Sequence, residues 1–188
     1  MAVKILLLLC LWFLVSCQTT SVDDAGKRLY PSAETSEMKC EGKTVNKLKE
    51  GIWTCYHSNG AKQAEIHYHN GVKNGPVKFW HSDGKPDLES MWQNGLLNGV
   101  TTQYNMLGKL VLEAQYRNGK LDGWVREWDG DGNKKLEAQY RENILHGEYR
   151  EYWNNGQIKE KGRYVKGEKQ SHWERYDTFG QPVPLDAK

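Results

Sequence analysis

Apolar and polar residues alternate along short segments of this chain. In the segment LVLEAQY (Leu110–Tyr116), the first, third, fifth and seventh residues are Leu, Leu, Ala and Tyr, while Glu113 and Gln115 lie between them. A period of two is typical of a β-strand that buries one of its faces. The segment Trp124–Trp128, which precedes the next turn, is therefore expected to be an antiparallel partner strand.

The pattern recurs every 24 residues from Gly51 to about residue 180. Three columns of turn residues keep this spacing: Gly60, Gly84, Gly108, Gly132, Gly156 and Gly180; Gly51, Gly75, Gly99, Gly123 and Gly147; and Gly71, Gly95, Gly119 and Gly167. Ser171 ends the second column, and Asn143 takes the fourth place of the third. Because Asn also tolerates the left-handed backbone conformation, a turn with positive φ explains that whole column.

Two aromatic columns share the spacing: Tyr56, Trp80, Tyr104, Trp128, Tyr152 and Tyr176; and Tyr68, Trp92, Tyr116, Tyr140 and Tyr164. We expect them to be structural, each ring packing on its neighbours in a thin core that no single repeat could bury. The alternative is a stacking face for a glycan, peptide or lipid. Trp124 and Trp153 lie outside the columns, where most other repeats have polar or small residues, and are candidate binding residues.

Each repeat is thus predicted to be two short antiparallel strands, with turns such as SNG or NNG and a second turn at an Asn-Gly column. The predicted fold is all-β: an elongated, single-layer antiparallel sheet of tandem 24-residue hairpin units with about eleven strands. The repeat domain is expected at 41–181, with five full repeats at 51–170, a partial sixth and a tail at 182–188. The Cys40–Val45 region and Ser171–Gln181 would cover the two edges.

One spacing is harder to reconcile with a simple strand. Trp53 and Tyr56 are three residues apart, yet both belong to largely apolar columns. Strict alternation would place them on opposite faces, so a bulge or burial on both faces is required.

The repeat unit resembles the bacterial variant of the MORN repeat, as in the YwqK family. Gly147–Tyr152 with Asn155 and Gly156 carries the pattern, as does Glu113–Tyr116 with the Asn-Gly turn that follows. The resemblance implies the MORN-type fold. For function it implies a scaffold or a module that binds membranes or proteins, and an antitoxin-like role is attached to some bacterial relatives.

The N-terminus indicates export. After MAVK, the segment Ile5–Val15 is apolar for 11 residues. That length suits the core of a signal peptide and falls short of the roughly 18 residues of a membrane-spanning helix. The next residues, Leu14–Cys17, resemble the bacterial lipobox, which implies cleavage of residues 1–16 and a lipid on Cys17. The alternative is an ordinary signal peptide cut near Ser16.

The following residues, 17–40, are polar and are expected to form a flexible tether. With Cys17 lipidated, the protein would be anchored to a membrane of the bacterial cell envelope. Gln18 after Cys17 favours the outer membrane, by analogy with lipoprotein sorting in enteric bacteria.

Cysteine usage agrees with export. Cys10 would leave with the signal peptide, so Cys40 and Cys55 remain beside the lipid site. In an oxidising compartment an even pair predicts a disulfide. The alternative is two unpaired thiols, and no Cys or His spacing indicates zinc.

Charge and composition exclude some function classes. The 26 Lys and Arg against 24 Asp and Glu give a net charge of +2 with interspersed signs, so no nucleic-acid partner is predicted. Asp129, Asp131 and Asn133 have the spacing of a calcium loop, but Lys134 and Tyr140 occupy its turn-glycine and closing-glutamate positions, so the stretch is predicted to be a hairpin turn.

The sequence evidence for catalytic groups is equally weak. His67 and His69 could face a metal together, but a polar strand face explains them better. One glutamate recurs in each repeat at Glu65, Glu89, Glu113 and Glu137, where cross-strand ion pairs are expected with the nearby columns that hold Lys78, Arg126 and Arg150. No catalytic residue, metal or cofactor is predicted.

The sequence therefore predicts a membrane-anchored, non-enzymatic lipoprotein that binds or scaffolds a protein, glycan or lipid partner. One alternative is a hydrolase of envelope glycans that draws its acid and base from the repeated glutamates. A second is an antitoxin-like protein of the YwqK family, although an exported lipoprotein fits a cytoplasmic antitoxin role poorly.

Overall fold

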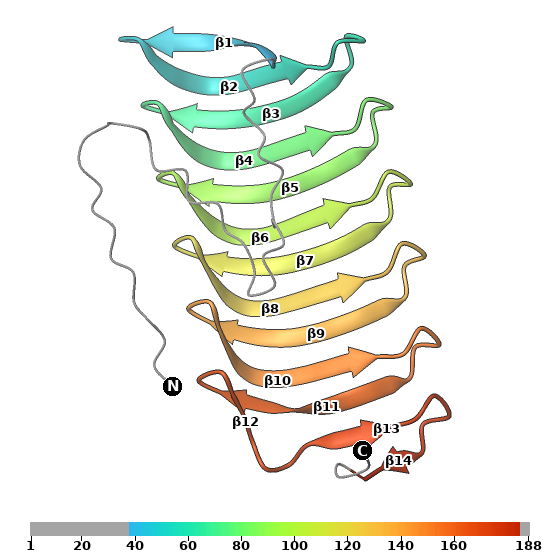
Figure 1. Cartoon of the computed structure of the whole chain (residues 1–188). Coiled ribbons are helices and arrows are strands. Elements are labelled where there is room, and N and C mark those ends of the chain that lie inside the picture. Colours follow the sequence, from blue (N-terminus) through green and yellow to red (C-terminus); the bar gives the residue numbers. More distant parts are fainter. Residues whose placement is uncertain (1–37, 185–188) are drawn as a thin grey trace, which may run out of the picture. The chain divides into compact units, whose positions relative to one another are not determined.

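The computed structural model describes residues 38–184, which form one antiparallel sheet (Figure 1). From β1 to β11 each strand pairs with the one before it, and β12 and β13 both pair with β11. The strands are β1 (Lys39–Val45), β2 (Leu48–Tyr56), β3 (Lys62–His69), β4 (Val72–Trp80), β5 (Pro86–Gln93), β6 (Leu96–Tyr104), β7 (Leu110–Arg117), β8 (Lys120–Trp128), β9 (Lys134–Arg141), β10 (Ile144–Tyr152), β11 (Ile158–Val165), β12 (Glu168–Lys169), β13 (Glu174–Tyr176) and β14 (Pro182–Val183). Within this range no helix is long and apolar enough to cross a membrane. The predicted signal peptide and Cys17 lie outside the described residues.

The predicted fold class is confirmed: the sheet is all-β, open and built of consecutive hairpins. The prediction of about eleven strands was too low, because the described region contains 14. The Cys40–Val45 region pairs with β2 as a full strand. Three short strands follow β11: β12 ends the fifth repeat, β13 lies in the partial sixth, and β14 lies in the predicted tail. Strand β1 begins at Lys39, so its first two residues had been wrongly assigned to the tether.

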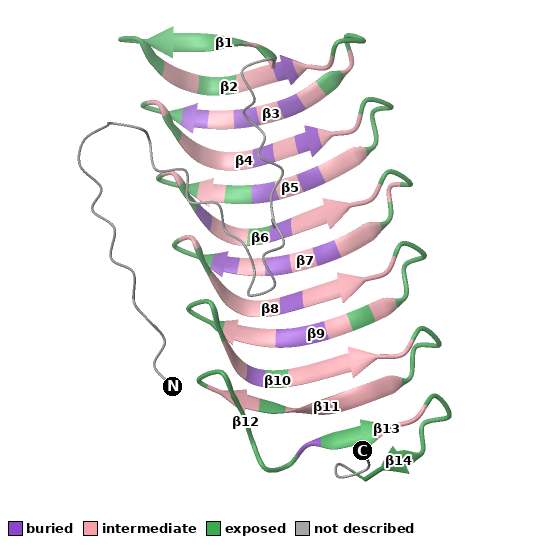
Figure 2. Ribbon diagram, viewed as in Figure 1, coloured by how far each residue is buried: buried purple, intermediate pink, exposed green. Residues whose placement is uncertain are grey.

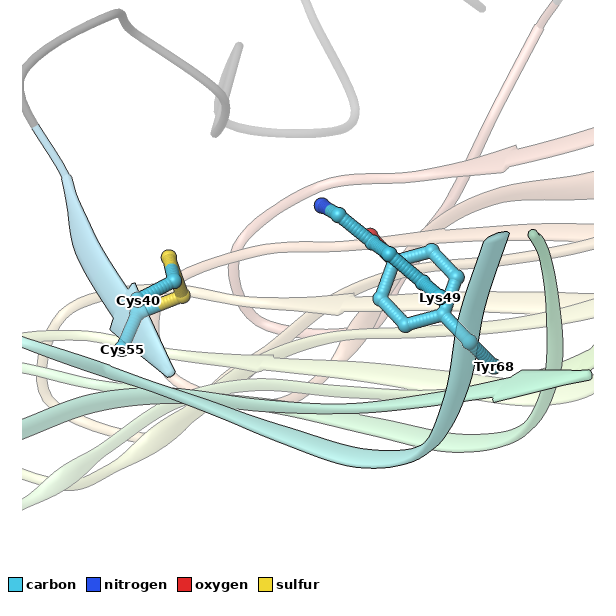
Figure 3. The surroundings of a disulfide bond; sticks show 4 residues. All are labelled: Cys40, Lys49, Cys55 and Tyr68. Atoms are coloured by element: carbon cyan, nitrogen blue, oxygen red, sulfur yellow. A yellow bond between two sulfur atoms is a disulfide. The ribbon is translucent and has the colours of Figure 1, made fainter. Parts of the chain in front are cut away.

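The sheet has two unlike faces. Residues that pair directly across two strands share a face, and successive residues along a strand alternate between faces. Figure 3 shows Cys40, Cys55, Lys49 and Tyr68 on the side toward which the strands bend, and this side is the inner face. All buried apolar residues of the described region lie on the inner face, so the single layer has its core on one side only.

A central row of small or branched side chains forms the floor of this core. Its members pair from strand to strand and are Ile66, Val77, Ser90, Thr101, Ala114, Val125 and Ala138, all at most 6% exposed. Tyr68 and Tyr116 are buried beside this row, and Phe79 is buried on its other side. Figure 2 shows the buried positions recurring along the middle strands. Larger side chains on both flanks thus exclude water from a floor that no second layer covers.

Two tryptophans of one repeat column close the ends of this core. At the N-terminal end Trp53 pairs with Gly42 of β1, and a Cβ on that glycine would lie 2.5 Å from the indole. At the C-terminal end a Cβ on Gly162 would lie 1.9 Å from Trp173, which is 8% exposed. Only glycine leaves room for an indole to lie flat on the neighbouring strand.

The strands bend at the glycine column that includes Gly75 and Gly123. Gly123 has a φ of +127°, and a Cβ there would lie 2.1 Å from Oε1 of Gln115. That Gln115 oxygen accepts a hydrogen bond from the backbone N–H of Trp124, at 3.0 Å. Around Gly75 the pairing shifts from Ile66 opposite Val77 to Tyr68 opposite Lys73, so the even-numbered strand carries extra residues. Extra residues in one strand bend it, which accounts for the curl of the sheet.

Trp53 and Tyr56 lie on opposite faces of the sheet, as alternation along β2 places them. The expected bulge lies in the partner strand β3, and Tyr56 is only half-buried, so the core remains on one face. Trp53 pairs with Ile66 on the inner face, whereas Tyr56 pairs with Lys62 on the outer face. Between them the register shifts, because Gln63 is an extra residue in β3. The two aromatic columns therefore lie on opposite faces of the sheet.

Candidate binding surface

The disulfide predicted between Cys40 and Cys55 is present in the structure. The two cysteines are directly paired across β1 and β2, and Cys55 is 1% exposed (Figure 3). Strand β1 is additionally held by a hydrogen bond from the Tyr56 hydroxyl to Oε1 of Glu41, at 2.9 Å. The disulfide thus fastens the terminal strand to the first repeat.

The calcium-like stretch is a turn, as predicted. Oδ1 of Asp129 accepts the backbone N–H groups of Asp131 and Asn133, at 2.9 and 2.8 Å. The side-chain hydrogen bond from Asn133, together with these backbone N–H groups, holds the pKa of Asp129 below its ordinary value. Asp177 caps the equivalent turn of the last repeat in the same way. The carboxylate is therefore occupied by its own turn, and residues 38–184 contain no cluster of three metal-ligating side chains.

The histidine pair on β3 also has ordinary partners. Nδ1 of His69 lies 3.0 Å from Oε1 of Glu50, and Nε2 of His67 lies 3.7 Å from Glu65. Each imidazole thus faces a different carboxylate, as on a polar strand face. The arrangement does not converge on one point.

The repeated glutamates each face cations on the outer face. Glu65 pairs with Lys62 at 3.0 Å and Glu89 with Lys78 at 3.6 Å. Glu113 binds Arg126. Such pairs neutralise the column and stabilise neighbouring strands, which matches the cross-strand role expected of it.

Glu137 is the most enclosed of the four, at 9% exposed. Its carboxylate accepts hydrogen bonds from Lys134 at 2.8 Å and from the Tyr152 hydroxyl at 2.6 Å, and Arg126 and Arg150 lie at 3.5 and 3.8 Å. Burial raises the pKa of Glu137, but the hydrogen bonds from Lys134 and Tyr152 lower it by more, so the net pKa is below its ordinary value. A carboxylate held ionised in this way is poorly suited to donate a proton as a general acid.

The outer aromatic column is a row of rings separated by other side chains. Because the rings lie on alternate strands, they are about 10 Å apart, and a residue of the intervening strand fills each gap. The intervening residues are Lys62, Pro86, Leu110, Lys134 and Ile158. Nζ of Lys62 lies 5.3 Å from the Trp80 ring centroid, and that of Lys134 lies 5.7 Å from Tyr152. The rings are half-buried, and each packs on these intervening side chains.

The inner column has direct ring contacts at its ends. Trp53 and Tyr68 meet edge to face, with centroids 6.3 Å apart, and Nζ of Lys49 lies 4.7 Å from both rings. Near the other end Tyr164 lies 5.3 Å from Trp173. These contacts are those of a structural core.

The two candidate tryptophans are both half-buried, and they occupy different positions of the repeat unit. Trp124 is on the outer face of β8, and the Arg126 guanidinium lies 5.3 Å from its ring. Trp153 begins a turn, where its Nε1 donates to the carbonyl of Tyr176 at 3.1 Å and Lys159 covers its ring at 5.1 Å. Both rings therefore already have partners, and the structure does not bring them together.

The outer face has an apolar patch that the periodicity did not reveal. It consists of seven aliphatic side chains of β1–β6, each 43% to 52% exposed: Val45, Leu48, Ile52, Val72, Met91, Leu96 and Val100. We call these residues the outer apolar patch. Two repeat columns supply most of it: the first is interrupted by Lys120 before Ile144, and the second becomes charged at Glu148. The patch is therefore confined to the N-terminal half of the sheet.

Residues 49–70 and 145–166 match the family model described as "MORN repeat variant". The chain therefore contains MORN-variant repeats. The two matched segments lie near opposite ends of an unbroken 24-residue register, so the units between them have the same hairpin geometry. No curated protein matches this MORN repeat protein.

Two solved structures are similar to the MORN repeat protein. "Crystal Structure of TarM" matches with a TM-score of 0.34 and 13% identity, over 57% of this chain and 22% of that one. "Crystal structure of GtfA/B complex bound to UDP and GlcNAc" matches with a TM-score of 0.32 and 11% identity, over 72% and 25%. This chain thus spans a quarter or less of the proteins it matches.

The outer apolar patch is the functional feature that sequence reasoning missed in this MORN repeat protein. A usable signal existed in the repeat columns themselves. The column of Ile52, Pro76 and Val100 is apolar in three consecutive repeats and then changes to Trp124 and Glu148. A change of chemistry along a column, at positions on the solvated face, identifies residues that the fold does not require.

Proposed function

We propose that this MORN repeat protein is a non-enzymatic scaffold of the bacterial cell envelope that binds a partner protein through its outer apolar patch. It would be held at the membrane, with the outer membrane favoured, by a lipid on Cys17. The observation that carries the proposal is the gathering of exposed aliphatic side chains on one half of one face. Contiguous exposed apolar surface of this kind usually marks an interaction site.

The chemistry of the patch favours a protein over a glycan. Glycans stack on open aromatic faces, but the rings on the outer face are half-buried and several, such as Trp80 and Tyr152, carry a lysine over the face. Aliphatic side chains such as Leu48 and Leu96 suit the apolar core of a protein interface. Their partner would need a matching apolar surface surrounded by polar groups.

The proposed anchor supports the same role. Cys17 follows an apolar segment of signal-peptide length, and about 20 polar residues separate it from β1. A lipid on Cys17 would attach the repeat domain to the membrane through this polar segment. Intact mass of the membrane-extracted protein tests the anchor: loss of residues 1–16 and a gain of acyl mass are expected, and a soluble product cut elsewhere contradicts it.

The two alternatives fit less well. A hydrolase needs a carboxylic acid and a base in distinct environments, whereas the glutamates of all four repeats face lysine or arginine. Turnover of an envelope glycan that is abolished by one Glu→Gln substitution, with the fold intact, would overturn the scaffold. An antitoxin-like role would require a cytoplasmic protein, which the proposed export excludes.

The binding proposal is tested by comparing two exposed aliphatic residues that occupy the same repeat column. Leu96 lies in the patch and Ile144 lies two repeats further on, at 48% and 50% exposed. Leu96→Ser should weaken crosslinking to the partner in intact cells, whereas Ile144→Ser should not. Combining Leu96→Ser with Leu48→Ser and Val72→Ser should lower recovery of that partner by about tenfold or more, since central apolar contacts dominate most interfaces.

The outcomes separate the proposal from its rivals. A protein recovered equally with the triple variant and the wild type is not bound by the patch, and such a result for every crosslinked protein would refute the proposal. Binding to lipid vesicles that the triple variant abolishes would identify the patch as a membrane surface instead.

A further inference from the structure

The two ends of the sheet differ in their capacity to accept another strand. At the C-terminal end β14 has only two residues, Pro182 and Val183, and Pro184 follows. Proline cannot donate a backbone hydrogen bond and protects edges from pairing. At the N-terminal end β1 has seven residues without proline. Among residues 38–184, β1 pairs with β2 along one edge, and no strand pairs with its other edge. In this part of the chain, the N-terminal edge is therefore the one that is open to pairing.

The open edge is held in place rather than loose. The disulfide joins β1 to β2, the indole of Trp53 covers Gly42, and Nε1 of Trp53 donates to the carbonyl of Lys43 at 3.1 Å. Glu41 receives the Tyr56 hydroxyl on the outer face. A strand with both faces anchored and one side free is a preformed template for strand addition, because no ordering of β1 is needed on binding.

The charges on β1 are complementary to β1 itself in the register that pairs the whole strand. Gly42 is the midpoint of Lys39–Val45, so a two-fold axis through Gly42 pairs all seven residues with those of a second copy. In that antiparallel arrangement Glu41 faces Lys43 of the second copy, and Lys43 faces Glu41 of the second copy, both on the outer face. Opposite charges directly across a sheet stabilise the pairing.

Other registers of the same strand are less favourable. A two-fold axis through Glu41 would place Glu41 against its own copy and Lys39 against Lys43 of the second copy. An axis through Lys43 would place two lysines together. Like charges directly opposite each other destabilise a sheet. An axis through Cys40 would also place Glu41 opposite Lys39, but it pairs only residues 39–41 of the strand, so the register through Gly42, which pairs all seven residues, is selected.

We propose that a second copy of this chain pairs with β1 edge to edge, antiparallel and centred on Gly42, and so forms a two-fold symmetric sheet. Such an isologous contact closes after two copies, because the other edge of each copy is blocked by prolines. The two outer faces then lie on the same side, with Val45 of each copy opposite Lys39 of the other and the Glu41–Lys43 pairs between them. The dimer would therefore present two copies of the outer apolar patch on one side, at opposite ends of the paired strands.

A zero-length carbodiimide crosslinker tests the register, since it joins a carboxylate to an amine only in direct contact. An equimolar mixture of full-length chains in detergent, one labelled with heavy nitrogen, distinguishes intermolecular from intramolecular products. We expect mixed-isotope peptides that link Glu41 to Lys43. Sedimentation equilibrium of the same sample should show the mass of one chain rising to that of two with concentration.

Charge-reversal variants provide the decisive test of the register. Because each variant also removes one of the two groups that the crosslinker joins, dimerisation is read by sedimentation: Glu41→Lys and Lys43→Glu should each weaken formation of the two-chain species by about tenfold, since each places like charges across the axis. Mixing the two variants should restore it, since two lysines of one chain then face two glutamates of the other. Lys43 also pairs with Glu50 of β2, so Lys43→Glu could weaken β1 within its own chain. Restoration by mixing shows that both variants still fold.

Lys39→Glu is the matched control, with the same charge change on the same strand. In the proposed register Lys39 faces Val45 of the second copy, so this variant should retain the two-chain species. Loss of that species with Lys39→Glu but not with Lys43→Glu would overturn the register. A single-chain mass at all concentrations, with no mixed-isotope product, would overturn the dimer and leave β1 to an extended segment of another protein.

Discussion

Replacing Thr101 by valine should stabilise the sheet. Thr101 lies in the middle of the inner-face row, is 1% exposed, and pairs with Ser90 on one side and Ala114 on the other. Within residues 38–184 its Oγ1 has no hydrogen-bond partner. Val77 is the buried equivalent in the preceding repeat, so the site already suits a valine side chain.

The magnitude follows from exchanging one buried hydroxyl for a methyl group of similar size. Burying an unpaired hydroxyl costs about 1–3 kcal/mol in proteins, and the added methyl gains about 0.8 kcal/mol of hydrophobic transfer at most. A net gain of about 1–2 kcal/mol in the free energy of unfolding is therefore expected. For a protein of this size it corresponds to a rise in melting temperature of about 2–8 °C.

Urea unfolding followed by tryptophan fluorescence measures this gain, with hydrogen exchange to localise it, because long repeat arrays need not unfold in one step. Thr101→Ser is the control: it keeps the hydroxyl and removes the methyl, and should destabilise by about 1 kcal/mol. Thr102→Val changes the neighbouring residue on the outer face and should have little effect. If Thr101→Val were neutral or destabilising while Thr101→Ser lost stability, the hydroxyl would have a partner and the reasoning would be wrong.

Three further predictions concern the disulfide, the backbone bend at Gly123 and the buried carboxylate of Glu137. Replacing Cys40 and Cys55 by serine should lower the free energy of unfolding by about 3 kcal/mol for a separation of 15 residues, and equal stability of the wild type with and without reductant would contradict this. Gly123→Ala, at a φ of +127° and without room for a Cβ, should cost about 1–3 kcal/mol by thermal melting, whereas Gly130→Ala, which meets nothing within 4 Å, should not. The pKa of Glu137 is lower in the folded state than in the unfolded state, so its stabilising contribution is present above the unfolded value and is lost as pH falls through the folded one. Unfolding measured between neutral and acidic pH should show a shallower acid loss for Glu137→Gln, and parallel profiles would argue against the role of this carboxylate.

The repeat architecture was accessible from the sequence because each element has a local chemical cause. Gly60 and its equivalents, together with the Asn-Gly turns, fix where each strand ends, and the alternation in Leu112–Tyr116 fixes which side chains face the core. The disulfide was accessible because only Cys40 and Cys55 remained to be paired. These features depend on spacing within one chain, which the sequence states directly.

The features that the sequence did not reveal depend on which residues pair across neighbouring strands. The extra residue Gln63 is visible only once Cys55 and Tyr56 are paired with their partners. Strand β1 lacks an apolar alternation, because its inner side is covered by Trp53 resting on Gly42 rather than by side chains of its own. The outer apolar patch draws one or two residues from each of several repeats, so no local window contains it.

The tryptophans that rest on Gly42 and Gly162 have a consequence for how such a chain can change length over evolution. Each interior hairpin touches only its immediate neighbours, whereas the special fit between indole and glycine is confined to the two termini. Duplication or loss of a whole 24-residue unit in the interior would leave both terminal fits unchanged. Length is therefore a freely adjustable property of this architecture, while the terminal units are constrained to stay as they are.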